Sequence, residues 1–131
     1  MSGPERKILK PKDYEKMISS LDIENFELKT SSILEARITL VSLERLAEDL
    51  LEIRREVSGD MRAIKLKYLG HDHTKSSLIG SLRGTKASTR RKSLNDKCDR
   101  ELGPYKNVLY IIDHYIEQIE EVKKDINEIK A

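Results

Sequence analysis

The chain has little of what builds disulfide frameworks, membrane spans or turn-rich sheets. Its 131 residues include one cysteine, no tryptophan, one phenylalanine, three prolines and six glycines. A single cysteine excludes an internal disulfide bond, and no apolar run approaches the ~20 residues that cross a bilayer. Neither a membrane-spanning segment nor a secretory signal pattern is seen, which predicts a cytoplasmic protein with no membrane partner.

Charge is what the chain has in abundance. Charged residues make up 37% of the sequence, the same share as hydrophobic residues. This balance is typical of thin helical layers, in which much of each helix faces water. Two bare helices bury little apolar surface and usually pair further. We therefore expect a homo-oligomer or a protein partner.

Apolar residues recur at alternating steps of three and four along two arms of the chain, which is the heptad spacing of packed helices. The two arms are approximately mirror-symmetric about Ser81, so that Leu43 is expected to face Ile119 and Leu50 to face Ile112. The pattern predicts an all-α fold, a long antiparallel, coiled-coil-like helical hairpin preceded by a short helix. The first arm carries Ile33, Ala36, Leu40, Leu43, Ala47, Leu50, Arg54, Val57, Met61, Ile64 and Tyr68, and the second carries Leu94, Cys98, Leu102, Tyr105, Leu109, Ile112, Ile116, Ile119, Val122, Ile126 and Ile129.

Local signals set the expected boundaries within a single domain, residues 1–131. Ser32 and Glu35 form a capping box that starts the first arm. Gly103-Pro104 kinks or interrupts the second arm, because proline removes a helical hydrogen bond; close backbone packing and a hinge both explain such a site. The expected segments are a flexible tail over 1–12, a short helix over 13–21, a linker over 22–31, a long helix over 32–69, a basic loop over 70–88 and a second long helix over 89–130.

The apolar stripe of the first arm is wider than a two-stranded seam needs. Dimerisation of two hairpins into a four-helix bundle would bury the excess, although the short N-terminal helix could cover part of it instead. This favours a non-enzymatic scaffold or adaptor that acts by self-association and protein–protein contacts. The expected interface comprises Leu34, Ile38, Val41, Leu46, Ile111 and Tyr115.

Positive charge collects where the hairpin is expected to turn. Between residues 60 and 97 there are ten Lys or Arg against three Asp, a net +7 in a chain of net +2. A basic tip attracts phosphates with little sequence preference. The alternative function is therefore a nucleic-acid-binding module, and a solvated charged loop is the simpler interpretation of the same pattern. The phosphate-contacting candidates are Arg83, Lys86, Arg90, Arg91 and Lys92.

Residues suited to catalysis are few. No sequence motif indicates a metal or cofactor, and Cys98 falls in the apolar seam, where an inert thiol is expected. A third alternative, a metal-dependent helical hydrolase, rests on carboxylates that would have to converge from both arms. They are Glu44, Glu48, Asp49 and Glu52 on the first arm and Glu117, Glu120 and Glu121 on the second.

Overall fold

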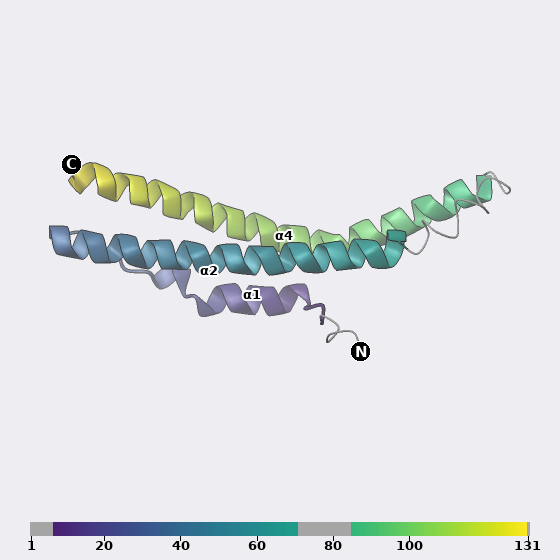
Figure 1. Cartoon of the computed structure of the whole chain (residues 1–131), viewed down its shortest axis with the longest axis horizontal. Helices are drawn as coiled ribbons and strands as arrows, with labels where there is room; N and C mark the ends of the chain where they lie inside the picture. Colours follow the sequence, from purple (N-terminus) through teal and green to yellow (C-terminus); the bar gives the residue numbers. More distant parts are fainter. Residues whose placement is uncertain (1–6, 71–84, 131) are drawn as a thin grey trace.

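The computed structural model describes residues 7–70 and 85–130, and within these ranges the regular structure is entirely helical. Figure 1 shows two long helices running antiparallel, with a short helix alongside them. The elements are α1 (Pro11–Ser20), the 3-10 turn η1 (Ile23–Asn25), α2 (Ile33–Lys65), the π-helical turn η2 (Leu66–Gly70) and α4 (Thr85–Lys130). The predicted all-α class and the packing of the two long helices are confirmed.

Helix α2 begins where the capping signal places it. The Ser32 side chain accepts a hydrogen bond from the Glu35 N–H at 3.1 Å, which satisfies one of the free donors of the first turn. The Glu35 carboxylate reaches back to Ser31, accepting from its N–H at 3.3 Å and from its hydroxyl. In the usual capping box, the Glu35 carboxylate would accept from the N–H of the N-cap residue Ser32. Here it accepts from the residue before the N-cap instead.

Helices α2 and α4 pack along the predicted seam from Ala36 onward, whereas Ile33, the first residue of that seam, is exposed. Leu43 and Ile119 line one groove between them, as the mirror symmetry predicts. Arg54, the one charged residue in the α2 seam, is half-buried at its edge, and its Nε donates to Asp113 Oδ1 at 2.7 Å. The buried apolar residues of the two helices are Ala36, Leu43, Leu46, Ala47, Leu50, Ile53, Val57, Met61 and Ile64 on α2 and Cys98, Leu102, Tyr105, Val108, Ile112, Ile119 and Ile126 on α4.

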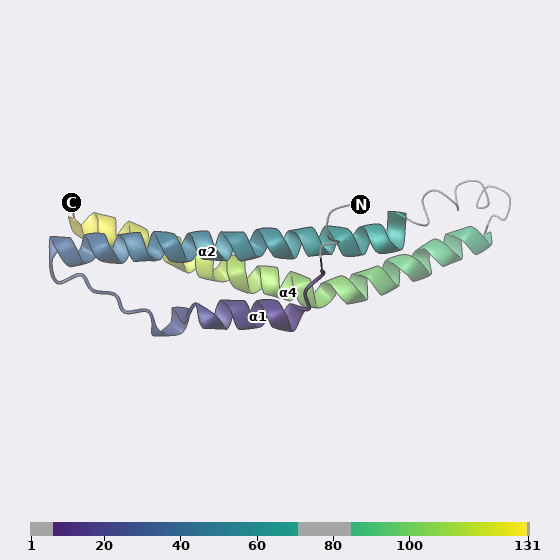
Figure 2. The same ribbon diagram turned by 60° about the horizontal axis from the view of Figure 1, so that its bottom comes forward.

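Helix α1 covers part of the groove between the long helices and contacts both of them. It starts at Pro11, two residues before the predicted start, because proline is favoured in the first turn. Tyr14 and Ile18 are its buried residues. After α1 the chain turns at Asp22, whose φ of 54° is left-handed, and Asn25 Nδ2 donates to the Asp22 side chain at 2.7 Å. Residues 21–32 then continue in the direction of α1 to the start of α2, which runs back the other way (Figure 2).

Helix α4 differs from its predicted form at its start, and at Gly103-Pro104 it excludes one of the two predicted alternatives. It starts at Thr85, so residues 85–88 are helical rather than part of the loop; residues 71–84 lie outside the described chain. It is also continuous across Gly103-Pro104, so the alternative of an interruption is wrong. Figures 1 and 2 show α4 bending along its length instead. A lone proline removes one hydrogen bond, which a long and well-packed helix can survive.

Close packing does not explain Gly103. A Cβ added at this position would meet nothing within 4 Å beyond its chain neighbours. The residue before a proline, however, is disfavoured in the helical conformation by a clash between its own Cβ and the proline ring. Glycine has no Cβ, so Gly103 allows Pro104 to sit inside a helix.

No helix in the described part of the chain has a stretch both long enough and apolar enough to cross a bilayer.

Candidate interaction surfaces

The outer face of α2 carries an uncovered apolar stripe formed by Leu34, Ile38 and Val41. Their exposed fractions are 68%, 57% and 49%. The spacing i, i+4 and i+7 places them on one side of the helix, opposite the buried side that carries Leu43 and Leu50. Three large apolar side chains in a row facing water form the type of surface that proteins usually cover. We call these three residues the outer stripe.

Exposed charges of both signs flank the outer stripe. Arg37 and Glu44 lie along one edge of it, seven residues and thus two helical turns apart. Arg45 continues the line of the stripe itself, one turn beyond Val41. The stripe is therefore short and is bounded by groups that can form ion pairs.

The other residues of the predicted interface are used within the chain. Leu46 is only 8% exposed, and Tyr115 and Ile111 are half-buried against the core. Leu46 and Tyr115 line an apolar groove with Ile23 and Phe26 from the η1 segment. The expectation that Leu46 lies on a free surface is wrong, because the chain after α1 folds over that side of α2.

Tyr115 is also tied to the η1 segment by a polar contact. Its hydroxyl donates to Glu24 Oε1 at 3.4 Å. Burial, and then the neighbouring Glu24 carboxylate, raises the pKa of Tyr115. The hydroxyl therefore stays protonated at neutral pH and keeps its role as donor.

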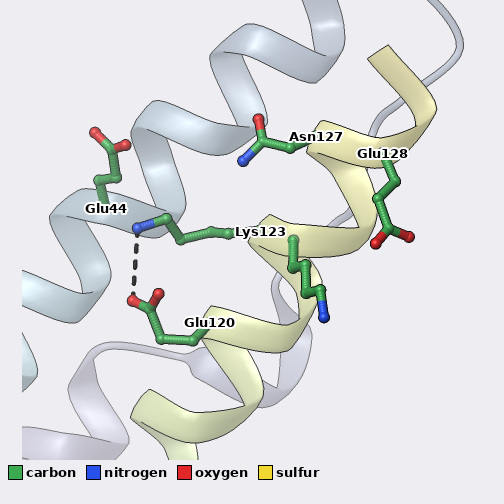
Figure 3. Close-up of a pocket in the computed structure, with 6 residues that line it drawn as sticks. Glu44, Glu120, Lys123, Asn127 and Glu128 are labelled. Atoms are coloured by element: carbon green, nitrogen blue, oxygen red, sulfur yellow. Dashed lines mark ion pairs between the residues drawn. The ribbon is translucent and has the colours of Figure 1, made fainter. Parts of the chain in front are cut away.

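A polar groove lies between α2 and the last turns of α4. Figure 3 shows Glu44 from α2 and Glu120, Lys123 and Asn127 from α4 around it, with the Lys123 ammonium group directed toward α2. Lys123 Nζ lies 3.5 Å from Glu120 Oε1. Of the carboxylates considered for a hydrolase, the groove brings together Glu44 and Glu120, and lysines accompany them. Within residues 7–70 and 85–130, no three His, Cys, Asp or Glu side chains are grouped so that they could hold a metal ion.

The first turns of α4 form a basic end. Arg90, Arg91 and Lys92 are exposed there, Lys86 lies in the first turn of the helix, and Arg83 falls outside the described residues. Residues 85–100 carry six Lys or Arg against two Asp, a net +4. Figures 1 and 2 show that this part of α4 extends past the end of α2.

Of these cations, Lys86 lies in the first turn, where a positive charge is unfavourable for the helix. A helix N-terminus carries partial positive charge and is stabilised by acidic residues, yet the first turn of α4 has none. The cations of the first turns add to that partial charge. The result is a helix end with a positive potential to which anions are attracted.

Sequence reasoning missed a buried polar cluster at the junction of the three helices. Asp60 on α2 is fully buried, and its Oδ2 accepts hydrogen bonds from the Tyr14 hydroxyl on α1 and from the Leu9 N–H at 3.1 Å. The Tyr105 hydroxyl on α4 donates to the Leu9 carbonyl at 2.6 Å. The rings of Tyr14 and Tyr105 meet edge to face, with centroids 6.5 Å apart. We call these four residues the junction cluster.

The junction cluster corrects the expected tail over 1–12. Both backbone groups of Leu9 are hydrogen-bonded to side chains of the long helices, so the chain is held against them before α1 begins. One sequence signal could have found the cluster: Asp60 continues the spacing of Ile53 and Val57, so a carboxylate occupies a position on the buried side of α2. Such a residue must be hydrogen-bonded to be tolerated.

Two further pKa values concern the chemistry available near the junction. Burial, and then the Asp60 charge, raises the pKa of Tyr105, so its hydroxyl remains a donor at neutral pH. Burial likewise raises the pKa of the Cys98 thiol, which Asp99 increases further and Lys65 opposes. A buried thiol with a raised pKa is a poor nucleophile, because the thiolate is the reactive form.

Comparisons with known proteins add no assignment to this geometry. No known family model, no curated protein and no solved structure matches the chain.

Proposed function

We propose that the chain is a helical scaffold that associates with a second copy of itself through the outer stripe of α2. The observation that carries the proposal is the exposure of Leu34, Ile38 and Val41 along one side of a helix whose opposite side is buried within the chain from Ala36 to Ile64. A second copy is the occupant that the flanking charges favour, because Arg37 and Glu44 supply both members of an ion pair.

The contact would pass through the α2 helices alone. Leu46, Ile111 and Tyr115, which a four-helix bundle of two hairpins was expected to use, are engaged with the core and the η1 segment. The three residues of the stripe also offer less surface than a standard interface, which buries ~800 Å² on each partner. We therefore expect weak association, with a dissociation constant of micromolar order or higher.

Charge substitution in the stripe tests this function. Val41→Glu should abolish concentration-dependent association, since it would bury a carboxylate against apolar groups. Leu51→Glu is the matched control, because Leu51 is exposed on the same helix but lies off the stripe. Light scattering at several concentrations, with circular dichroism to verify folding, gives the result. Equal behaviour of the two variants would refute the assignment to the stripe.

A second candidate function, binding of nucleic-acid phosphates, is supported by the basic end of α4. The specific observation is that this cationic part of the helix extends past α2 and has no acidic residue in its first turn. Without aromatic side chains among Arg90, Arg91 and Lys92, the contacts would be to the backbone and would carry little sequence preference.

This second function predicts binding that weakens steeply with salt. The double variant Arg90→Glu, Arg91→Glu should lower the affinity for labelled duplex DNA or RNA at least about tenfold and reduce the slope of log K against log salt by about two. Lys12→Glu, Lys16→Glu makes the same charge change at exposed positions of α1 and serves as control. Anisotropy titrations at several salt concentrations measure both. Equal losses in the two double variants would show a general charge effect instead of a site.

A further inference from the structure

The charges around the outer stripe carry information on how two copies would be oriented. If the stripe is the seam of a two-helix contact, Leu34, Ile38, Val41 and Arg45 are its core positions, and Arg37 and Glu44 occupy the same flanking position in successive heptads. Flanking positions pair differently in parallel and antiparallel helices. The two orientations therefore place different charges opposite the same side chains.

A parallel pair would set like charges against each other. Arg45 would face the partner's Arg45 in the seam, and Glu48 would face the partner's Glu48 one step further on. At the flank, Glu44 would lie beside the partner's Asp49. Each contact repels, and two of the three occupy positions that favour apolar residues.

An antiparallel pair centred between residues 39 and 40 removes these conflicts. Ile38 then packs on the partner's Val41, and Leu34 lies beside the aliphatic stem of the partner's Arg45. Arg37 comes opposite the partner's Glu44, and the twofold symmetry repeats that ion pair. Both helices contribute residues 33–46, so Glu48 lies beyond the overlap and faces no copy of itself.

We infer that two copies of this chain associate through antiparallel α2 helices, held in register by reciprocal Arg37–Glu44 ion pairs. This inference rests on the proposed self-association. Its structural consequence concerns the basic ends of α4, which lie toward the Lys65 end of α2. The twofold axis would separate the two Lys65 positions by about 75 Å, at a rise of about 1.5 Å per residue. The paired molecule would present a basic end at each pole.

Reversing single charges distinguishes the orientations, because the two models predict effects of opposite sign. In the antiparallel pair, Arg37→Glu and Glu44→Arg each create two like-charge contacts and should weaken association about tenfold. The double variant Arg37→Glu, Glu44→Arg should recover it. In a parallel pair, Glu44→Arg would strengthen association by relieving the repulsion from the partner's Asp49.

Glu52→Arg is the matched control. It makes the same charge change on an exposed residue of α2 beyond residues 33–46, so the association of an antiparallel pair should be little affected. Sedimentation equilibrium gives the dissociation constants, and circular dichroism excludes unfolding of the Glu44→Arg variant.

The outcomes separate the two claims. Weakening by each single reversal with recovery in the double variant supports the antiparallel pair. Association that Val41→Glu abolishes but Glu44→Arg strengthens would overturn the orientation and leave self-association standing. A chain that is monomeric at every concentration would overturn both.

Discussion

At the scale of single residues, Asp60 lies at the centre of the hydrogen bonds that connect α1 and the backbone before it to the long helices. Its carboxylate accepts from a side chain on α1 and from the backbone that precedes α1, and Tyr105 on α4 holds the same backbone from the other side. Hydrogen bonds to a buried charge are stronger than neutral ones, and leaving such a charge poorly solvated is costly. The position of α1 therefore depends on polar groups as well as on Tyr14 and Ile18 packing.

Removal of the Tyr14 hydroxyl tests this dependence. Tyr14→Phe keeps the ring in place but takes one donor from the buried Asp60 carboxylate, so the free energy of unfolding should fall by about 2 kcal/mol. Tyr110→Phe, on an exposed tyrosine of α4, should change it by less than about 0.5 kcal/mol. Urea denaturation followed by circular dichroism measures both values. Equal small effects would show that the junction cluster does not stabilise the fold.

At the scale of elements, the sequence predicted the long helices well and their local details less well. Heptad spacing identified the seam because residues that recur at this spacing lie on one side of a helix and are buried together, as Leu50, Val57 and Ile112 are. The cover over Leu46 could not be predicted in the same way. It depends on the left-handed turn at Asp22 and on where η1 then lies, and no repeat pattern encodes either.

The candidate surfaces also include some features that the sequence predicts and others that it does not. Leu34, Ile38 and Val41 could be found from spacing alone, since no segment of the described chain covers them. The basic end was visible as composition, but its extension past α2 follows from α4 beginning at Thr85. In the junction cluster, Leu9 contacts Asp60 across a sequence separation of 51 positions and Tyr105 across one of 96. A single sequence does not reveal contacts over such separations.

The bend in α4 yields a prediction about Gly103 and Pro104. With Pro104 present, Gly103→Ala should bring no gain, because the new Cβ would clash with the proline ring. In a Pro104→Ala background, the same substitution should stabilise the protein by about 1 kcal/mol, since the Cβ meets open space. Unfolding free energies of the four proteins form a double-mutant cycle. The same increment in both backgrounds would refute this account of Gly103.

At the scale of the whole molecule, the two ends of the hairpin differ in charge. One end carries Arg90, Arg91 and Lys92 on α4, and the other carries the mixed groove of Glu44, Glu120 and Lys123. The outer stripe lies at the same end as this groove, on the N-terminal turns of α2. With the proposed pairing face at one end and a cationic surface at the other, a pair of these elongated molecules would hold two basic ends apart.

The central claim is that the outer stripe of α2 joins two copies of the chain, and sedimentation equilibrium of the unmodified protein tests it most directly. Between about 1 μM and about 1 mM, a range that brackets weak association, the apparent mass should rise from 15.1 kDa toward twice that value. The Val41→Glu variant should remain at 15.1 kDa throughout. A wild-type mass that stays at that of one chain up to the highest concentration would contradict the account.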